Sequence, residues 1–453
     1  MTSRTFPDGP RLNFPKVVIA QLFPRRFPFD PLAFNVSLAR KYGDIAFFRL
    51  GPLRVYQVNH PDLIREVLVD QAHKFYKPRL LKRGARRMLG SGLLTSDGDL
   101  WKQQRRLIQP AFRHDRLSKY SDTMVALSLR IVESFRDGEV VDIGAVMGQL
   151  TQSVVVKALF GEDLPPEIAD VGDALLMLSE TANQRLNAAM QLPSWVPTRK
   201  NLHERKALAR LDVVLQLLIH TRRNSGLQHD DLLSVLLEAA DDESHARMSD
   251  HQLRDELMTL FLAGQDTTAN ALTWTWYLLA RHPGVEVKLR EELARVLAGR
   301  PPAATDLPAL AYVEMVLRES MRLFPPAPAF AREPVEDVVL GGYPIAKGSL
   351  ITFSTYALHR DPKFFPDPER FDPERFAPGR EESRPRYSYL PFGAGPRICI
   401  GNGFAMMEAC LILASIAQRC SLTLDPMVEI APKQLVTLRP DRPVRMRVRI
   451  PGR

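Results

Sequence analysis

One segment indicates the architecture of this chain: Phe392-Gly393-Ala394-Gly395-Pro396-Arg397-Ile398-Cys399-Ile400-Gly401. Two glycines before the single cysteine and one after it predict a tight loop whose backbone amides approach the sulfur closely. An apolar run predicts a helix over Gly403–Ala417, and the amino end of a helix favours an anion. Arg397 adds a positive charge. We therefore expect the pKa of Cys399 to be lowered toward the thiolate form.

Three roles are open to Cys399. A buried structural thiol is the commonest role for a cysteine, and it suits Cys410 and Cys420, which lie within and just after the apolar helix. A nucleophilic cysteine requires a histidine base, and no histidine is close in the sequence, although a spatial partner stays possible. A thiolate that ligates a haem iron requires no base.

A second unusual segment lies in the longest predicted helix, Asp250 to about Arg281. Ser249 and Gln252 form a capping-box pattern at its start, and Pro283-Gly284 ends it. About thirty residues at ~1.5 Å each give nearly 50 Å, which is enough to cross the whole molecule. The helix contains Ala263-Gly264-Gln265-Asp266-Thr267-Thr268, although an interior glycine costs ~1 kcal/mol. Such departures from local rules are typical of functional sites.

Two further motifs follow this helix. Glu319 and Arg322 lie three residues apart in a predicted helix, Leu310–Phe324, and therefore share one of its faces. Leu317, Leu323 and Phe324 around them indicate burial, where a carboxylate needs a partner. Eight prolines between Asp361 and Pro396 exclude regular structure, yet five phenylalanines predict packing. We expect a rigid meander, which includes Pro373-Glu374-Arg375-Phe376.

These four motifs resemble those of the cytochrome P-450 superfamily: F-x-x-G-x-R-x-C-x-G, A-G-x-D/E-T-T, E-x-x-R and P-E-R-F. They occur in the family's order, and the resemblance runs from about Lys41 to the carboxy terminus. It implies a mainly α-helical fold with a small β-rich lobe. It further implies haem b between the long central helix and the cysteine loop, with Cys399 as the axial thiolate ligand.

The resemblance also implies roles for individual residues. The Thr267 hydroxyl would hydrogen-bond dioxygen, Asp266 would supply protons through water, and Arg375 would close a structural Glu-Arg-Arg network with Glu319 and Arg322. Arginine suits bidentate pairing with the two haem propionates. His359 is a weaker candidate for that pairing. The residues expected to bind the cofactor are Trp101, Arg105, Ala263, Arg332, Phe392, Arg397 and Gly401.

We expect a single domain over residues 1–453, although the length alone would suggest about three. A proline-rich segment covers 1–30, and the β-rich part combines about 31–75 with 330–356 and 421–450. Helices occupy 76–325, apart from a loop-like stretch between His73 and Asp99. The meander and cysteine loop cover 361–401. The expected short elements are helices at Pro31–Lys41, Leu117–Phe135, Met147–Phe160, Lys206–Thr221 and Asp231–Ala240, with strands at Ile45–Leu50 and Val55–Asn59.

Composition narrows the class of protein. The chain is 45% hydrophobic and 25% charged, as in ordinary globular proteins, and three cysteines argue against a disulfide scaffold. Lys and Arg exceed Asp and Glu by 61 to 52, but no basic run predicts nucleic-acid binding. The amino terminus has no secretory apolar region, and Asp266 within apolar Leu257–Ala280 favours a core helix over a transmembrane one. We expect a cytoplasmic protein.

The expected activity is that of a haem-thiolate monooxygenase, which inserts one atom of O2 into a C–H or C=C bond of a hydrophobic, possibly lipid-like, small molecule. A separate ferredoxin or flavodoxin-type donor with its reductase would supply electrons, and Lys102, Arg106 and Arg113 are candidates to face it. A peroxide-driven peroxygenase and a non-enzymatic basic binding protein are the alternatives. The candidate substrate walls are Leu80–Leu94, the regions of Met177 and Met190, Leu260–Ala263, Ala327–Phe330 and the loop near Leu435.

Overall fold

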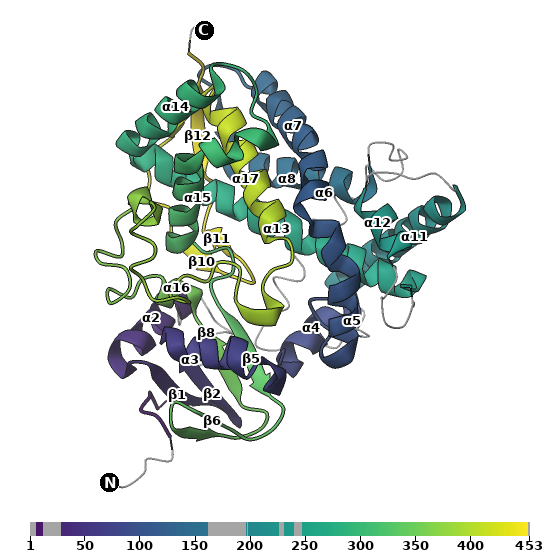
Figure 1. The fold of residues 1–453 in the computed structure, drawn as a ribbon, viewed down its shortest axis with the longest axis vertical. Helices are drawn as coiled ribbons and strands as arrows, with labels where there is room; N and C mark the ends of the chain where they lie inside the picture. The colour runs from purple at the N-terminus through teal and green to yellow at the C-terminus, as the bar shows by residue number, and fades with distance from the viewer. Residues whose placement is uncertain are drawn as a thin grey trace.

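Helices dominate the computed structural model, which describes residues 6–11, 29–161, 196, 198–225, 231–239 and 247–451 (Figure 1). A five-stranded sheet lies at one end of the molecule, and the helices form the rest. The helices are α2 (Pro31–Tyr42), α3 (Pro61–Arg65), α4 (Arg79–Leu89), α5 (Gly98–Ile108), α6 (His114–Leu117), α7 (Ser121–Ser134), α8 (Ile143–Phe160), α11 (Arg199–Ser225), α12 (Leu232–Glu238), α13 (Asp250–Arg281), α14 (Pro283–Leu297), α15 (Ala311–Leu323), α16 (Thr355–Leu358) and α17 (Asn402–Ala417).

The five-stranded sheet joins the amino-terminal part to residues nearly 300 positions later. Its strands are β1 (Ile45–Leu50), β2 (Leu53–Val58), β3 (Phe75–Tyr76), β5 (Phe330–Pro334) and β8 (Leu350–Phe353), in the order β1-β2-β8-β5-β3. A tight turn pairs Leu50 with Leu53, and β2 runs parallel to β8. Buried Tyr56, Ile351 and Phe353 form a core on this sheet that is separate from the helical core.

The carboxy-terminal strands form separate sheets. A three-stranded sheet contains β4 (Val140–Asp142), β12 (Arg445–Arg449) and β9 (Ser421–Leu424), and two hairpins are formed by β10 (Pro432–Gln434) with β11 (Leu438–Pro440) and by β6 (Val338–Leu340) with β7 (Tyr343–Ile345). In Figure 1, β12 lies near the carboxy-terminal end of the molecule, far from β1 and β2. The β10–β11 hairpin is fixed to α13 because the Trp274 indole donates to the Leu438 carbonyl at 3.0 Å.

Helix α13 has the bounds and the cap that the sequence predicts. Ser249 and Gln252 exchange hydrogen bonds in a capping box, and most of the helix is buried. Helices α8, α15 and α17 pack against it. A Cβ at Gly264 would lie 3.2 Å from Val155 of α8, so the small residue allows the two helices to approach. The prediction of a buried central helix is confirmed.

Within the part of the chain that the structure describes, α8 is the single helix whose length and apolar composition suffice to cross a membrane. Half of its residues are buried inside the protein. It packs against α7, α12 and α13, and Thr151 in its middle donates to the Gln265 carbonyl of α13 at 3.1 Å. These contacts are those of a core helix.

The loop-like stretch predicted between His73 and Asp99 is partly wrong, because α4 occupies Arg79–Leu89. Its inner face buries Ala85 and Leu89, whereas Arg79, Arg83 and Arg86 are exposed. The sequence shows no clear amphipathic pattern here, because α4 is short, contains Gly84 and many arginines, and buries only two apolar residues. The remaining segment, Gly90–Asp97, is irregular and connects α4 to α5.

Residues 361–396 form the predicted non-repetitive meander, with one 3-10 turn inside it, η6 (Pro373–Phe376), and a second at its end, η7 (Gly395–Arg397). Phe365, Phe371 and Phe376 within it are buried. Arg322 of α15 holds the segment because its guanidinium donates to the carbonyls of Pro368 and Arg370. The meander is therefore rigid through packing and side-chain bonds rather than through regular structure.

Candidate functional site

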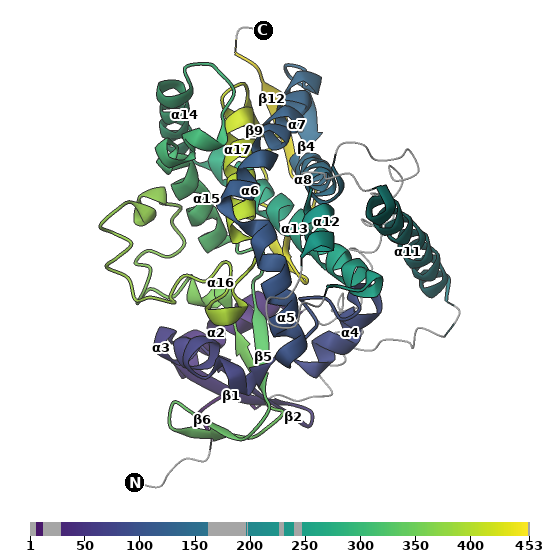
Figure 2. The same cartoon turned by 45° about the vertical axis from the view of Figure 1, so that its right-hand side comes forward.

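The cysteine loop is shaped by backbone bonds and by a glycine. The Cys399 amide donates to the Phe392 carbonyl at 2.9 Å, which closes the loop just before α17. Gly395 has φ +69°, and a Cβ there would lie 1.9 Å from the Leu68 carbonyl oxygen. A glycine is required here because of both the backbone conformation and the close approach. The turn before α17 lies beside α5 (Figure 2), where Arg105 donates to the Ile398 carbonyl at 2.9 Å.

The Cys399 side chain is exposed, although protein atoms surround it closely enough to desolvate the thiol. Burial raises the pKa of Cys399, while the Gly401 amide and the Arg105 guanidinium lower it. The expectation of a lowered thiol pKa is therefore wrong for the protein alone, because desolvation outweighs these contributions. Arg397 contributes nothing here, since it turns toward Asp97. A coordinated metal would itself favour the thiolate.

Helix α5 brings two predicted site residues to the cysteine loop. Trp101 and Arg105 lie four residues apart on the same face of the helix. The Arg397 guanidinium lies over the Trp101 ring at 4.4 Å from its centroid, and Arg105 binds the loop backbone. Sequence reasoning assigned Trp101 and Arg105 to one helix face, and the structure shows that this face meets the loop.

Positive charge is concentrated beside the loop. Arg332 of β5, Arg397 and Lys77 interact electrostatically, and Asp97 is the carboxylate nearest to them, at 2.7 Å from Arg397. Burial together with Arg397 lowers the pKa of Arg332 to about 10, and burial lowers the pKa of Lys77 to about 7. One buried guanidinium nitrogen of Arg397 has no hydrogen-bond partner among the described residues. Asp97 also pairs with Lys82 at 2.9 Å, and the Lys77 ammonium donates to two backbone carbonyls. Arg332 and Arg397 are therefore the cations of this cluster whose guanidinium donors suit the propionates of a haem.

Helix α13 is expected to provide the opposite wall. Ala263 is exposed in the middle of this core helix, between buried Phe261 and buried Gln265, so that face borders open space. Thr267, one turn further on, donates from its hydroxyl to the Ala263 carbonyl at 2.7 Å. A flat apolar ring could therefore lie against the Ala263 methyl group. The donor set of thiol, small residue and cations fits a haem.

Asp266 is already paired in this structure. The Thr437 hydroxyl donates to one of its carboxylate oxygens at 2.7 Å, and Arg439 donates to the other at 2.5 Å. Both partners belong to the β10–β11 hairpin, which Trp274 fixes to the same helix. Any proton transfer by Asp266 would have to proceed from this ion pair.

Phe392 and Gly401, also expected at the site, lie in the cysteine loop on either side of Cys399.

The Glu-Arg-Arg network is assembled, and it is structural. Glu319 and Arg322 are fully buried and form two hydrogen bonds of 2.7 and 2.9 Å, while Arg375 approaches Glu319 to 3.3 Å. His359 belongs to this region rather than to the cation cluster. Its ring is fully buried, its Nε2 accepts from the Leu390 amide at 2.8 Å, and burial lowers its pKa to about 3. The weaker expectation that His359 pairs with a propionate is wrong.

Several site residues escaped the sequence analysis: Lys77, Asp97, Glu256, Glu408, Thr437 and Arg439. Their nearest partners are distant in the sequence, such as Asp97 with Arg397 and Asp266 with Arg439. No local pattern identifies these residues. Lys77, directly before Pro78, gave only a weak signal. Met177 and Met190, proposed as substrate walls, lie outside the described residues.

Comparison with known proteins settles the family. The sequence profile described as Cytochrome P450 matches residues 7–447. The solved structure titled "Crystal structure of cytochrome P450DA heme domain" superposes with a TM-score of 0.84 at 28% identity, covering 93% of each chain. The chain belongs to the cytochrome P450 family. The predicted fold class and enzyme class are thereby confirmed, and the non-enzymatic binding protein is excluded.

Curated relatives from Streptomyces are similar to this cytochrome P450 over most of their length. Cyclooctatin synthase of Streptomyces melanosporofaciens is 40% identical, over 90% of this chain and 89% of the relative. Cyclooctat-9-en-7-ol 5-monooxygenase of the same organism is 37% identical, over 86% and 85%. Pentalenene oxygenase of Streptomyces avermitilis is 35% identical, over 93% and 94%. The chain is thus a P450 monooxygenase, and members of this family use O2 and an electron donor.

Proposed function

We propose that this P450 monooxygenase hydroxylates or epoxidises a cyclic terpene, using O2 and electrons from a separate ferredoxin or flavodoxin-type donor. The observation that carries the proposal is the exposed Cys399 thiol beside the cation cluster, with the exposed Ala263 face of α13 as the expected opposite wall. Haem b held there by Cys399 would supply oxygen activation. The residues expected to hold its propionates are Arg105, Arg332 and Arg397, with Trp101 beside them.

The chain's own residues would organise the protons. The Thr267 hydroxyl lies on the same face as Ala263, and Asp266 adjoins it. Cleavage of the O–O bond to release water needs two protons at a site that otherwise excludes water. An acid–alcohol pair meets that need, because the Asp266 carboxyl would exchange protons and the Thr267 hydroxyl would position the group that accepts them. The Arg439 guanidinium donates to the Asp266 carboxylate, so proton transfer would start from this pair.

The proposed substrate class rests on the relatives and on apolar residues near the site. The names of the Streptomyces relatives identify cyclooctat-9-en-7-ol and pentalenene, which are cyclic and mostly apolar. In this chain, Leu94 is 46% exposed on the segment before α5, and Phe330 and Ala327 near β5 are partly exposed. Such side chains offer contact without hydrogen bonds, which suits a hydrocarbon.

The electron donor would approach the cysteine loop from outside. A hollow of about 340 Å³ lies there, lined by Pro391, Phe392, Gly393, Ile398, Asn402 and Met406 among others. It adjoins the loop that carries Cys399, so a donor seated at it would have a short path to the thiolate. Lys102 and Arg113 are exposed nearby on α5 and just beyond it, each with an acidic neighbour, Asp99 and Asp115.

The deciding experiment is the difference spectrum of the purified protein, reduced under carbon monoxide. We expect a Soret maximum at about 450 nm that is lost in Cys399→Ala. Cys410→Ala is the matched control because Cys410 is fully buried in α17 and should leave the band intact. A parent protein without this band after haem supplementation would contradict the proposed function.

The substrate class needs a second experiment. Cyclic terpene hydrocarbons and alcohols should give type I spectral shifts at lower concentrations than fatty acids with the same number of carbons. Product formation should be faster with ferredoxin, reductase and NADPH than with hydrogen peroxide alone. Faster turnover with peroxide would favour the peroxygenase alternative, which the Asp266–Thr267 pair argues against. Preference for fatty acids would contradict the terpene assignment.

A further inference from the structure

Two helices, α4 and α11, carry the whole positive excess of this protein. Together they contain twelve lysines and arginines but only two acidic residues, which gives a net charge of +10. The remaining chain contains 49 basic and 50 acidic residues, which nearly cancel. A surplus confined to two elements in this way indicates a surface for an anionic partner.

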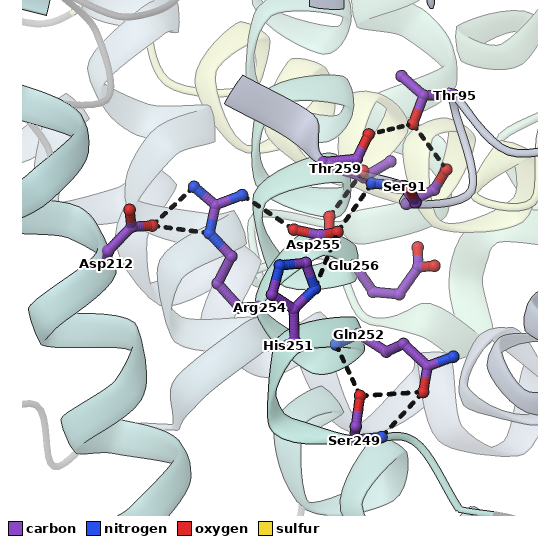
Figure 3. Close-up of polar contacts among 12 residues, drawn as sticks. Ser91, Thr95, Asp212, Ser249, His251, Gln252, Arg254, Asp255, Glu256 and Thr259 are labelled. Atoms are coloured by element: carbon purple, nitrogen blue, oxygen red, sulfur yellow. Dashed lines mark hydrogen bonds and ion pairs between the residues drawn. The ribbon is translucent and has the colours of Figure 1, made fainter. Parts of the chain in front are cut away.

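The two helices are neighbours in the fold. Arg87 of α4 approaches Glu204 of α11 to 3.8 Å. Arg254 of α13 joins them, because its guanidinium donates to the Met88 carbonyl of α4 at 3.0 Å and to the Asp212 carboxylate of α11 at 2.7 Å (Figure 3). Both helices lie on the right-hand side of the molecule in Figures 1 and 2. Their charges therefore act at one side of the protein.

These contacts use both acidic residues of the two helices, and Glu204 is also buried. The basic residues are different, since several of them are exposed and form no ion pair within the described part of the chain. They include Arg83, Arg86, Arg199 and Lys206. The positive charge of the two helices is therefore directed to the surface, while their negative charge is used inside.

Exposed aliphatic side chains lie among these cations. A stripe of exposed residues at three- and four-residue spacing follows one face of α11: Leu202, Lys206, Arg210, Val213 and Leu217. Val213 is 66% exposed and Leu217 is 56% exposed. On α4, Leu80 is 78% exposed and precedes Arg83 by three residues. We call this stripe, together with Leu80, Arg83 and Arg86 of α4, the basic face.

The composition of the basic face matches an anionic lipid surface. Aliphatic side chains enter the boundary between lipid headgroups and acyl chains, and lysines and arginines beside them attract anionic headgroups. An acidic protein would also complement the charge. However, neither helix contains an aromatic residue of the kind that anchors protein interfaces. The aliphatic residues therefore favour lipid over protein as the partner.

We propose that the basic face docks this protein on bilayers that contain anionic phospholipids. The face includes none of the residues proposed to hold the haem, and none that lines the hollow proposed for the electron donor. Docking is therefore independent of the proposed function. One consequence does rest on that function: a cyclic hydrocarbon would dissolve in the same bilayer, so docking would place the enzyme beside its substrate.

Flotation of the haem-loaded protein with lipid vesicles tests the docking. Vesicles of phosphatidylcholine with about 30% phosphatidylglycerol should bind the protein about tenfold more tightly than phosphatidylcholine alone, and salt should weaken that binding. The double variant Arg83→Glu, Lys206→Glu should lose about tenfold or more in affinity for the anionic vesicles, because it replaces attraction by repulsion on both helices.

The matched control is the double variant Arg445→Glu, Arg449→Glu. It makes the same change of charge on two exposed residues of β12 and should weaken vesicle binding by less than about threefold. All four substitutions alter exposed side chains. Retention of the band at about 450 nm checks that each variant folds and holds haem.

A fluorescent label tests whether the aliphatic residues enter the lipid. An environment-sensitive fluorophore on Val213→Cys should shift its emission to the blue when anionic vesicles are added. The same label on Val339→Cys is the control, because Val339 is 61% exposed on β6, outside the basic face. The native cysteines do not compete for the label, since Cys410 and Cys420 are buried and Cys399 would hold the haem.

The outcomes separate this inference from the proposed function. Equal binding to vesicles with and without phosphatidylglycerol, or equal losses in the two double variants, would overturn the basic face as a lipid site. Binding of an acidic ferredoxin that Arg83→Glu, Lys206→Glu abolishes, without vesicle binding by the parent, would identify a protein partner instead and would also overturn it. Absence of the 450 nm band in the parent would contradict only the proposed function, and flotation would still report on docking.

Discussion

Burial dominates the titration of single side chains in this protein. Glu408 of α17 is fully buried, and burial raises its pKa well above the ordinary value of 4.5, with the Thr268 hydroxyl of α13 as a partial offset. Burial also raises the pKa of Cys399, and the nearby Arg105 charge opposes this shift. A buried carboxyl that keeps its proton adds a pH-dependent cost to folding once the unfolded chain can ionise it.

The first prediction concerns Glu408→Gln. Above about pH 4.5 the unfolded chain releases the Glu408 proton while the folded protein retains it, so the free energy of unfolding of the parent falls as pH rises. Glutamine has no proton to lose. The variant should therefore gain stability relative to the parent as the pH rises above about 4.5. Denaturant unfolding of the haem-free proteins at several pH values measures this.

A matched control for Glu408 is Glu429→Gln, because Glu429 is exposed. Its unfolding is measured at the same pH values. If the difference between Glu408→Gln and the parent were independent of pH, Glu408 would be ionised in the folded protein and our account of it would be wrong.

At the scale of elements, side chains join regular structure to irregular segments. Arg322 of α15 bonds Glu319 and the carbonyls of His359, Pro368 and Arg370, so one guanidinium holds the meander against the helix. The segment Gly90–Asp97 is held in the same way by α13. In both places buried charge replaces the ladder of hydrogen bonds that a strand or helix would supply.

The second prediction concerns Arg322→Ala. Removing the guanidinium leaves the Glu319 carboxylate buried and leaves three carbonyls without their donor. Breaking a buried pair in this way costs about 3 to 5 kcal/mol of the free energy of unfolding. Arg65→Ala is the control, because the Arg65–Asp70 pair is exposed and should contribute at most about 1 kcal/mol. Chemical denaturation compares the two variants, and equal losses would contradict the structural role of Arg322.

At the scale of the whole molecule, the net charge of +9 and the hollow beside the cysteine loop bear on electron transfer. Lys102 and Arg113 lie on the helical side of that loop, while their neighbours Asp99 and Asp115 reduce the local charge. Attraction of an acidic donor would then depend on several charges together rather than on one ion pair, and salt would screen it.

The third prediction is that reduction by an acidic ferredoxin slows by about tenfold when the ionic strength rises from about 0.05 to 0.5 M. Lys102→Glu should slow reduction at low ionic strength and have little effect at high ionic strength. Arg449→Glu on β12 is the control, because it makes the same charge change on an exposed residue of another element. Stopped-flow measurement of haem reduction gives these rates, and rates insensitive to salt would refute electrostatic docking.

The sequence by itself determined the local features of this protein. The four motifs, the bounds and cap of α13, and the irregular meander follow from spacing, capping residues and proline content, which act over a few residues. Tertiary structure alone decided which distant side chains meet: Asp97 with Arg397, Asp266 with Arg439, and Asp255 and Glu256 with the segment before α5. It also decided that the carboxy-terminal strands form sheets of their own and that desolvation outweighs charge at Cys399. These outcomes depend on burial and on long-range packing, which no local pattern encodes.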